Sequence, residues 1–297
     1  MSQQFTPEEV RKLKQIIGSP VSTKKTTHVI QVLDESSSME TGQDVTISSY
    51  NEMQDIAKKQ HSDENEITFT LVKFSDHASI SSIRVPAGNA IGLNTTNYKP
   101  HGLTALYDAI GLAIQTARNF PSDDNTAYLL QIFTDGGENA STSYRDPRTL
   151  KAMIAELQAT GKWTVTVAGP KGQIDLFTQY FDIPKGNTTT FDPTSYQSRT
   201  SNAGMMVGST ANYFAMRGAG GQSMTNAYSS VKDVLDQADN DPLNPSVSFG
   251  ALPPDSSLIG QTAEQLAQKA QASAAWPFPT TKSHGPNSNT VEGTTTT

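Results

Sequence analysis

Short runs of apolar and β-branched residues recur along much of the chain, each bounded by polar turns. Runs of this kind predict strands that are buried on both faces, as in a parallel sheet. The predicted strands cover residues 29–33, 67–74, 78–85, 128–133, 163–167 and 188–191. The segment 75–77 is too short for a crossover connection, so the two strands that flank it must be antiparallel.

Apolar residues at helical spacing fill most of the intervals between these strands. The predicted helices begin near Gln43, after a glycine turn at Gly102, at Pro147 and near Ile174. Alternating strands and helices predict an α/β fold of the Rossmann-like type. We therefore expect a mostly parallel central sheet with one antiparallel edge strand and helices on both faces.

The two ends of the chain have a different pattern from this central domain, which we place at residues 26–192. Residues 1–25 hold a compact helix and a lead-in segment, because Thr6 and Pro7 mark a helix start. Residues 193–240 are again helical in pattern and either pack on the domain or serve assembly. Residues 241–297 are rich in Pro, Ser, Asn and Thr, a composition typical of a disordered tail.

Composition narrows the class of protein. The chain of 297 residues has a net charge of −7, which argues against a nucleic-acid partner held through phosphate contacts. It has no cysteine, which excludes disulfides and thiolate metal sites. The start lacks the pattern of a signal peptide, and no apolar stretch approaches the ~18 residues of a membrane span. We expect a soluble, cytoplasmic protein without a membrane partner.

Polar residues that could bind a ligand follow two of the predicted strands. Asp34, Ser36 and Ser38 come directly after strand 29–33, and Asp135 comes after strand 128–133. Thr104 stands at a predicted helix start, after the glycine turn. Because parallel neighbouring strands end at one edge of a sheet, we expect these side chains to meet there.

Two carboxylates with neutral hydroxyls suit a hard divalent cation. Mg²⁺ prefers six oxygen ligands and keeps some of its waters, so this set is a plausible partial shell, with Mn²⁺ or Ca²⁺ as alternatives. The hydroxyls would leave the ion Lewis acidic, and an Asp or Glu from a protein partner could take an open position. The other interpretation is that these are only capping and turn residues.

These motifs resemble the metal-ion-dependent adhesion site (MIDAS) of the von Willebrand factor type A (vWA) domain family. The family's three pieces occur in order, as Asp34/Ser36/Ser38, Thr104 and Asp135. The resemblance implies a vWA fold in which the hydroxyls touch the ion directly and the aspartates bind directly or through water. Ser37 stands where the family often has glycine, and we expect the loop to differ there because serine has less access to positive φ.

Further stretches look like the small vWA proteins often encoded by tailed bacteriophages. They are Leu103–Ile110, Asp135–Ser141, Gly161–Thr164 and Ile183–Asn187. This resemblance implies a non-enzymatic, cation-dependent protein-interaction module in the host cytoplasm. Two alternatives stay open: a virion or assembly component with a non-essential metal site, and an accessory protein of a MoxR-type AAA+ ATPase.

Enzymatic hydrolysis is the least favoured interpretation. The five histidines, His28, His61, His77, His101 and His284, are scattered without ligand spacing, and no serine-nucleophile elbow occurs.

The long loop 86–102 offers Asn94, Tyr98 and His101 for partner contact, although plain solvent exposure is the simpler explanation.

Overall fold

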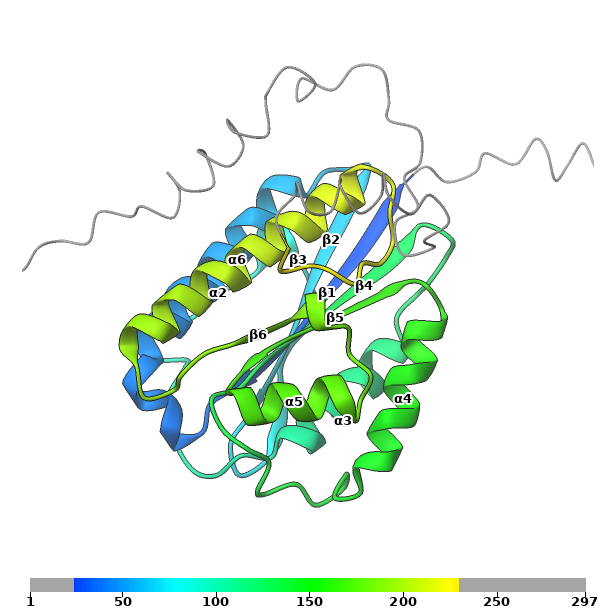
Figure 1. The fold of residues 1–297 in the computed structure, drawn as a ribbon. Helices are drawn as coiled ribbons and strands as arrows, with labels where there is room; N and C mark the ends of the chain where they lie inside the picture. The colour runs from blue at the N-terminus through cyan, green and yellow to red at the C-terminus, as the bar shows by residue number, and fades with distance from the viewer. Residues whose placement is uncertain (1–23, 230–297) are drawn as a thin grey trace, which may run out of the picture. The chain divides into compact units, whose positions relative to one another are not determined.

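The computed structural model describes residues 24–229. A six-stranded sheet in the order β3-β2-β1-β4-β5-β6 runs through this part of the chain (Figure 1). The strands are β1 (Lys25–Asp34), β2 (Asn65–Phe74), β3 (Ala78–Pro86), β4 (Thr126–Phe133), β5 (Trp163–Gly169) and β6 (Thr188–Thr190). All neighbours pair in parallel except β3, which runs antiparallel to β2 at the edge. The predicted fold class is confirmed.

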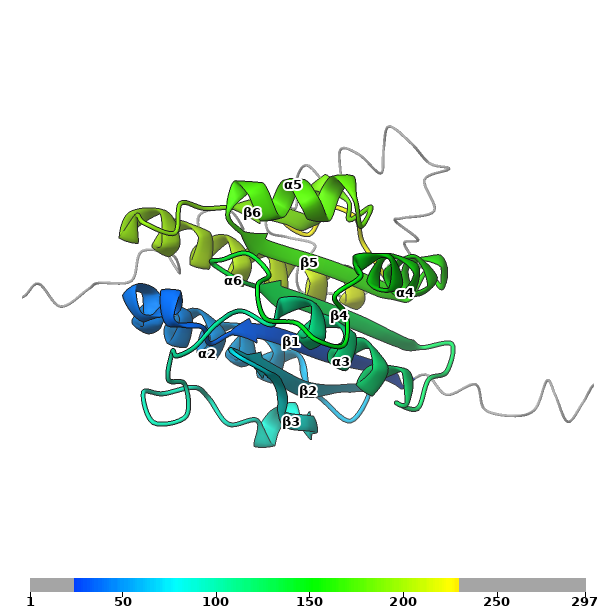
Figure 2. The ribbon, with the colours of Figure 1, turned by 90° about the horizontal axis from the view of Figure 1, so that it is seen from below.

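Helices cover both faces of the sheet (Figures 1 and 2). They are α2 (Gln43–Gln60), α3 (Leu106–Arg118), α4 (Pro147–Ala159), α5 (Lys171–Gln179) and α6 (Tyr196–Gly218), with short 3₁₀ turns η1 (Ser37–Gly42), η2 (Ala87–Asn89) and η3 (Lys185–Asn187). Helices α3, α4 and α5 share one hydrophobic core with the strands, and α2 and α6 lie against the other face.

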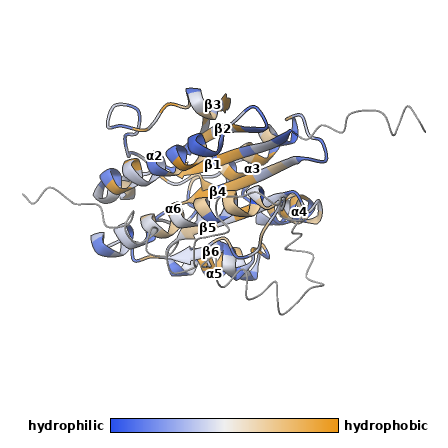
Figure 3. Cartoon of the chain, turned by 90° about the horizontal axis from the view of Figure 1, so that it is seen from above, coloured by the Kyte–Doolittle hydropathy of each residue, from blue (hydrophilic) through white to orange (hydrophobic). Residues whose placement is uncertain are grey.

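Hydrophobic residues concentrate on the central strands (Figure 3). Alternation along each strand divides them between the two faces, because successive side chains point in opposite directions. In β1, Ile30 and Val32 join the core beneath α3, whereas Val29 joins the core beneath α6. The near-continuous apolar runs of the sequence therefore reflect burial on both faces.

Helix α6 packs on the α/β domain, which is one of the two alternatives expected for the segment 193–240. It packs beside α2, and Tyr213 and Phe214 are buried against the sheet. Near its end, buried Arg217 donates to the backbone oxygens of Asn125 and Gly221, at 2.9 and 2.8 Å. The predicted helix at 5–18, residues 230–240 of the predicted helical segment and the tail lie outside the described residues.

Tyr98 corrects the interpretation of the long loop. Its side chain is fully buried, and its hydroxyl donates to the backbone oxygen of Asp34 at 2.6 Å. Tyr98 is therefore neither a solvated residue nor a partner contact, but a support for the end of β1. Asn94 and His101 are exposed, as a loop position suggests.

His28 is a buried titratable group in β1. Its Nδ1 lies 2.7 Å from the hydroxyl of Thr68, and its ring packs against Phe120 and Tyr128. Burial is the main cause that lowers its pKa from 6.5 to about 4. The folded protein therefore keeps a neutral imidazole at pH values where an unfolded chain would carry a charged one.

This difference predicts acid sensitivity that His28→Gln removes. Below the unfolded pKa of 6.5, the unfolded state binds the extra proton until the folded pKa of about 4 is reached. Across that window, the wild type should lose about 1 kcal/mol of unfolding free energy per pH unit relative to the variant. Urea unfolding of both proteins at several pH values measures the difference. Parallel pH profiles would contradict the assignment.

Candidate metal centre

The ends of two adjacent parallel strands bring the predicted acids together. Strands β1 and β4 pair with Leu33 opposite Phe133, so the residues that follow lie at the same edge of the sheet. The hydroxyl of Thr134 donates to Asp34 Oδ2 at 2.7 Å and links the two strand ends. Asp34 and Asp135 are both buried, with 0% and 4% of their surface exposed.

The two serines after β1 lie against these acids. The Ser36 and Ser38 hydroxyl oxygens are 3.1 Å apart, and Ser38 Oγ donates to Asp135 Oδ1 at 2.5 Å. Neighbouring ligands of an octahedral ion with bonds of about 2.1 Å lie roughly 3 Å apart. The spacing of the two hydroxyls therefore fits two adjacent positions on such an ion.

Thr104 reaches the same place from the start of α3. A Cβ added to Gly136 would lie 3.8 Å from both Thr104 Oγ1 and Ser38 Oγ, so both hydroxyls face that glycine. Asn139 fixes the threonine, because its side-chain oxygen accepts from the Thr104 backbone N–H at 2.8 Å. The structure thus brings all five predicted residues to one edge of the sheet.

The loop after Asp34 forms without the glycine that is frequent in the related motif. Ser37 begins η1, and it is not among the described residues that have positive φ. The positive φ near the site belongs to Gly102, at 70°, whose carbonyl accepts from the Ser37 backbone N–H. The backbone of this loop therefore accommodates a serine at position 37, and the change in loop shape expected there is not needed.

Asp34 is held in an environment that disfavours its charge. Burial is the main cause that raises its pKa to about 6, and hydrogen bonds from Ser36 and Thr134 oppose the rise. The neighbouring Asp135 raises the pKa further. A cation between the two acids would relieve this cost, because an opposite charge favours the ionised carboxylate.

Sequence reasoning missed Arg199, which also belongs to this cluster. Its Nη2 donates to Asp135 Oδ2 at 2.7 Å, and both side chains are buried. The signal was present: Arg199 has helical spacing from Met206 and Thr210, on the inner face of the predicted helix. An arginine on a buried face needs an acidic or carbonyl partner, but the sequence does not say which one.

The oxygen atoms of the cluster are suitable ligands for a hard cation. No group of three or more His, Cys, Asp or Glu side chains that could hold a metal occurs among residues 24–229. An ion at this edge would therefore depend on hydroxyl oxygens together with the two carboxylates, a set suited to Mg²⁺ or Mn²⁺. The guanidinium of Arg199 opposes binding of a metal cation, because it places a positive charge 2.7 Å from Asp135 Oδ2.

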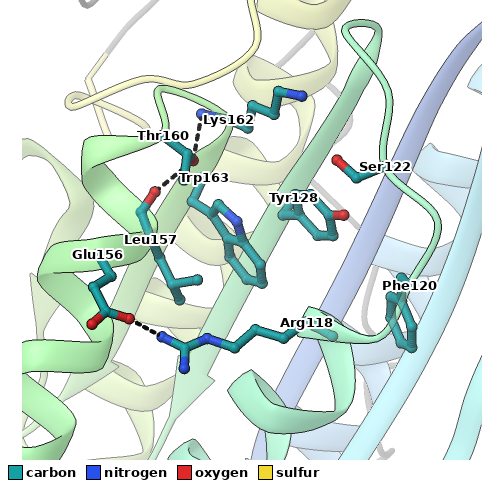
Figure 4. Close-up of a pocket in the computed structure, with 10 residues that line it drawn as sticks. Arg118, Phe120, Ser122, Tyr128, Glu156, Leu157, Thr160, Lys162 and Trp163 are labelled. Carbon is teal, nitrogen blue, oxygen red and sulfur yellow. Dashed lines mark hydrogen bonds and ion pairs between the residues drawn. The ribbon is translucent and has the colours of Figure 1, made fainter.

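A separate hollow of about 380 Å³ lies at the opposite, amino end of β4 and β5 (Figure 4). Tyr128 and Trp163 stack in it with ring centroids 4.2 Å apart, and an ion pair between Arg118 and Glu156 lies beside them. Because parallel strands carry their carboxyl ends at the other edge, this hollow is not part of the candidate metal centre.

Comparison with protein families gives one match. The model of the MMPL family matches residues 16–191, which is more than half of the chain. The motifs did not lead us to expect this family. None of the helices in the described residues 24–229 has the length and apolarity needed to cross a membrane. No curated protein matches the chain.

Several solved structures are similar to the chain at low identity. Proximal thread matrix protein 1 from the mussel byssus is 17% identical with a TM-score of 0.40, covering 63% of this chain and 46% of that one. A von Willebrand factor type A protein from Catenulispora acidiphila is 16% identical with a TM-score of 0.40, covering 64% and 43%. The pilus adhesin SpaC from Lactobacillus rhamnosus GG is 12% identical with a TM-score of 0.47, covering 64% and 31%. This chain thus spans less than half the length of each of these three chains.

The buried ion pair predicts a large cost for removing its acid. Asp135→Ala should lower the unfolding free energy in EDTA by about 3–5 kcal/mol, because it leaves the Arg199 guanidinium buried and unpaired. Glu156→Ala is the control: it breaks the exposed pair with Arg118 and should cost less than about 1 kcal/mol. Urea unfolding measures both, and equal small losses would contradict the role assigned to the pair.

Proposed function

The chain belongs to the MMPL family, whose model matches residues 16–191, and because this match identifies no functional site, we propose a function from the geometry of the candidate metal centre. The protein is a non-enzymatic, divalent-cation-dependent protein-interaction module of the vWA type. Where the family match and the vWA-like motifs differ, the proposal rests on the motifs, because their side chains meet in the fold. The observation that carries it is the convergence of three hydroxyls and two carboxylates at one edge of the sheet.

Ser36, Ser38 and Thr104 would touch the ion through their hydroxyl oxygens. Asp34 and Asp135 would balance its charge, directly or through water. When bound, the ion supplies a Lewis acid that attracts a carboxylate oxygen. Mg²⁺ is the preferred ion, with Mn²⁺ and Ca²⁺ as alternatives, because all three favour oxygen ligands.

A binding role fits the surroundings of the site better than catalysis. A hydrolytic metal site usually has a general base near the ion. His28 lies in the core, with its ring against Phe120 and Tyr128, and His61 Nδ1 accepts from the Ile67 backbone N–H. His101 is closest to the motif in sequence, but its Nε2 lies 3.0 Å from the Ser75 hydroxyl and its Nδ1 lies 2.8 Å from the Lys99 carbonyl. We therefore propose an Asp or Glu of a protein partner, rather than a substrate, as the group that completes the ion's shell. The phage resemblance and the virion or ATPase-linked roles stay predictions.

Calorimetric titration of metal-free protein with MgCl₂ and MnCl₂ tests the proposal. We expect saturable binding by the wild type and none by Asp34→Ala, because one of two charge-balancing groups is lost. Thr104→Ala should weaken binding by roughly tenfold or more. Thr178→Ala is the matched control, because its hydroxyl donates to Ile174 O within α5, away from the site.

Unchanged binding by Asp34→Ala would contradict the site. If the wild type shows no binding at millimolar ion, adhesion through a resident metal is not supported, and a structural role for the cluster replaces it.

A further inference from the structure

Arg199 contacts the proposed site from the first turn of α6. Its Nη2 donates to Asp135 Oδ2 at 2.7 Å and to the backbone oxygen of Ser38 at 3.3 Å. Its Nε donates to Pro193 O at 2.8 Å, so the guanidinium is held on two sides. The side chain is 4% exposed and that of Asp135 is 0% exposed, so solvent does not screen their interaction.

The contact occupies one of the two carboxylate oxygens of Asp135 with a positively charged donor. Oδ2 accepts from Arg199, whereas Oδ1 accepts from the hydroxyl of Ser38, the residue proposed to bind the ion beside it. The Ser38 hydroxyl can turn its hydrogen away when its oxygen binds a cation. The guanidinium has no such freedom, because a second group anchors it and arginine does not lose its proton.

We propose that Arg199 is the residue that sets the ion affinity of this site, holding it low by neutralising one of the two carboxylates. This inference rests on the proposed function. With Arg199, the site offers a dication two carboxylates and one fixed positive charge. Without Arg199, the same ligands would attract the ion with their full charge.

The net charge of the occupied site determines which partner group it attracts. A dication in a site that already holds a guanidinium keeps a net positive charge, since the two carboxylates cannot cancel both. An acidic group of the partner then neutralises that excess. The ion alone is held weakly, and the ion with the partner's carboxylate is held more firmly, so the chemistry of Arg199 favours binding of the two together.

A purely structural role for Arg199 makes a different prediction. The ion pair also attaches α6 to the end of β4, and its loss would then lower stability with or without metal. Under our proposal, loss of the charge lowers stability in EDTA, where Asp135 is left unpaired, and Mg²⁺ restores it by taking the place of the guanidinium. The response to metal separates the two roles.

The experiment compares the wild type with Arg199→Met and Arg199→Lys. Mg²⁺ and Mn²⁺ titrations by calorimetry give the ion affinity, and thermal melts in EDTA and in MgCl₂ report folding. Arg217→Lys is the control, because Arg217 is the other buried arginine of α6 and contacts backbone oxygens away from the site.

We expect Arg199→Met to bind Mg²⁺ at least about tenfold more tightly than the wild type, since a unit charge so close to a ligand strongly opposes a dication. Its melting temperature should rise more on adding Mg²⁺ than that of the wild type. Arg199→Lys, which keeps the charge, and Arg217→Lys should stay within about threefold of the wild-type affinity.

Four results would overturn the inference. If folded Arg199→Met binds Mg²⁺ as the wild type does, or more weakly, Arg199 does not set the affinity, although the proposed function stands. If Arg199→Met does not fold even with Mg²⁺, the role of the residue is structural. If Arg199→Lys binds Mg²⁺ at least about tenfold more tightly than the wild type does, the charge of Arg199 does not control the affinity. If no protein binds Mg²⁺, the proposed function fails together with this inference.

Discussion

The parallel pairing of β1 with β4 is the constraint on which the site depends. Its register sets Leu33 opposite Phe133, so both chains leave the sheet at the same edge and at nearly the same height. Adjacent strands are about 4.8 Å apart, which brings the acids that follow within reach of one ion. A shift by one residue would turn each side chain to the opposite face of the sheet. The hydroxyl of Thr134, bonded to Asp34, holds the two ends in that register.

The sequence predicted the sheet, and the meeting of the five candidate residues at one end of it, because both have local signals. The apolar runs that define β1 and β4 are buried on both faces, and such runs are distinctive. Strand bounds were less accurate: β1 begins at Lys25 rather than Val29, because buried polar residues such as Thr27 extend it. The five site residues stood next to strand ends or a glycine turn, so topology alone placed them together.

The roles of Tyr98 and Arg199 escaped sequence analysis for a different reason. Each acts on a residue that is distant in the chain, Tyr98 on the backbone of Asp34 and Arg199 on Asp135. Their own neighbourhoods gave only a polar loop and a helix of mixed pattern. Long-range packing decides such contacts, and a single sequence without its fold does not carry that information.

Two buried arginines attach α6 to opposite edges of the sheet. Arg199 pairs with an acid at the carboxyl edge, whereas Arg217 binds backbone oxygens around the amino ends of β1 and β4. Along a helix they are separated by about 27 Å, close to the length of a long strand. Helix α6 therefore reaches both edges of the sheet, and its first turn supplies a charge to the candidate metal centre.

The most direct test of this account is a crystal structure of the protein grown or soaked with MnCl₂, with anomalous diffraction used to locate the ion. The account predicts one anomalous peak at the carboxyl edge, about 2.1–2.2 Å from the hydroxyl oxygens of Ser36, Ser38 and Thr104. Arg199 should remain on Asp135 Oδ2. A well-ordered cluster without a peak at millimolar Mn²⁺, or a peak only elsewhere, would contradict a cation site at this edge.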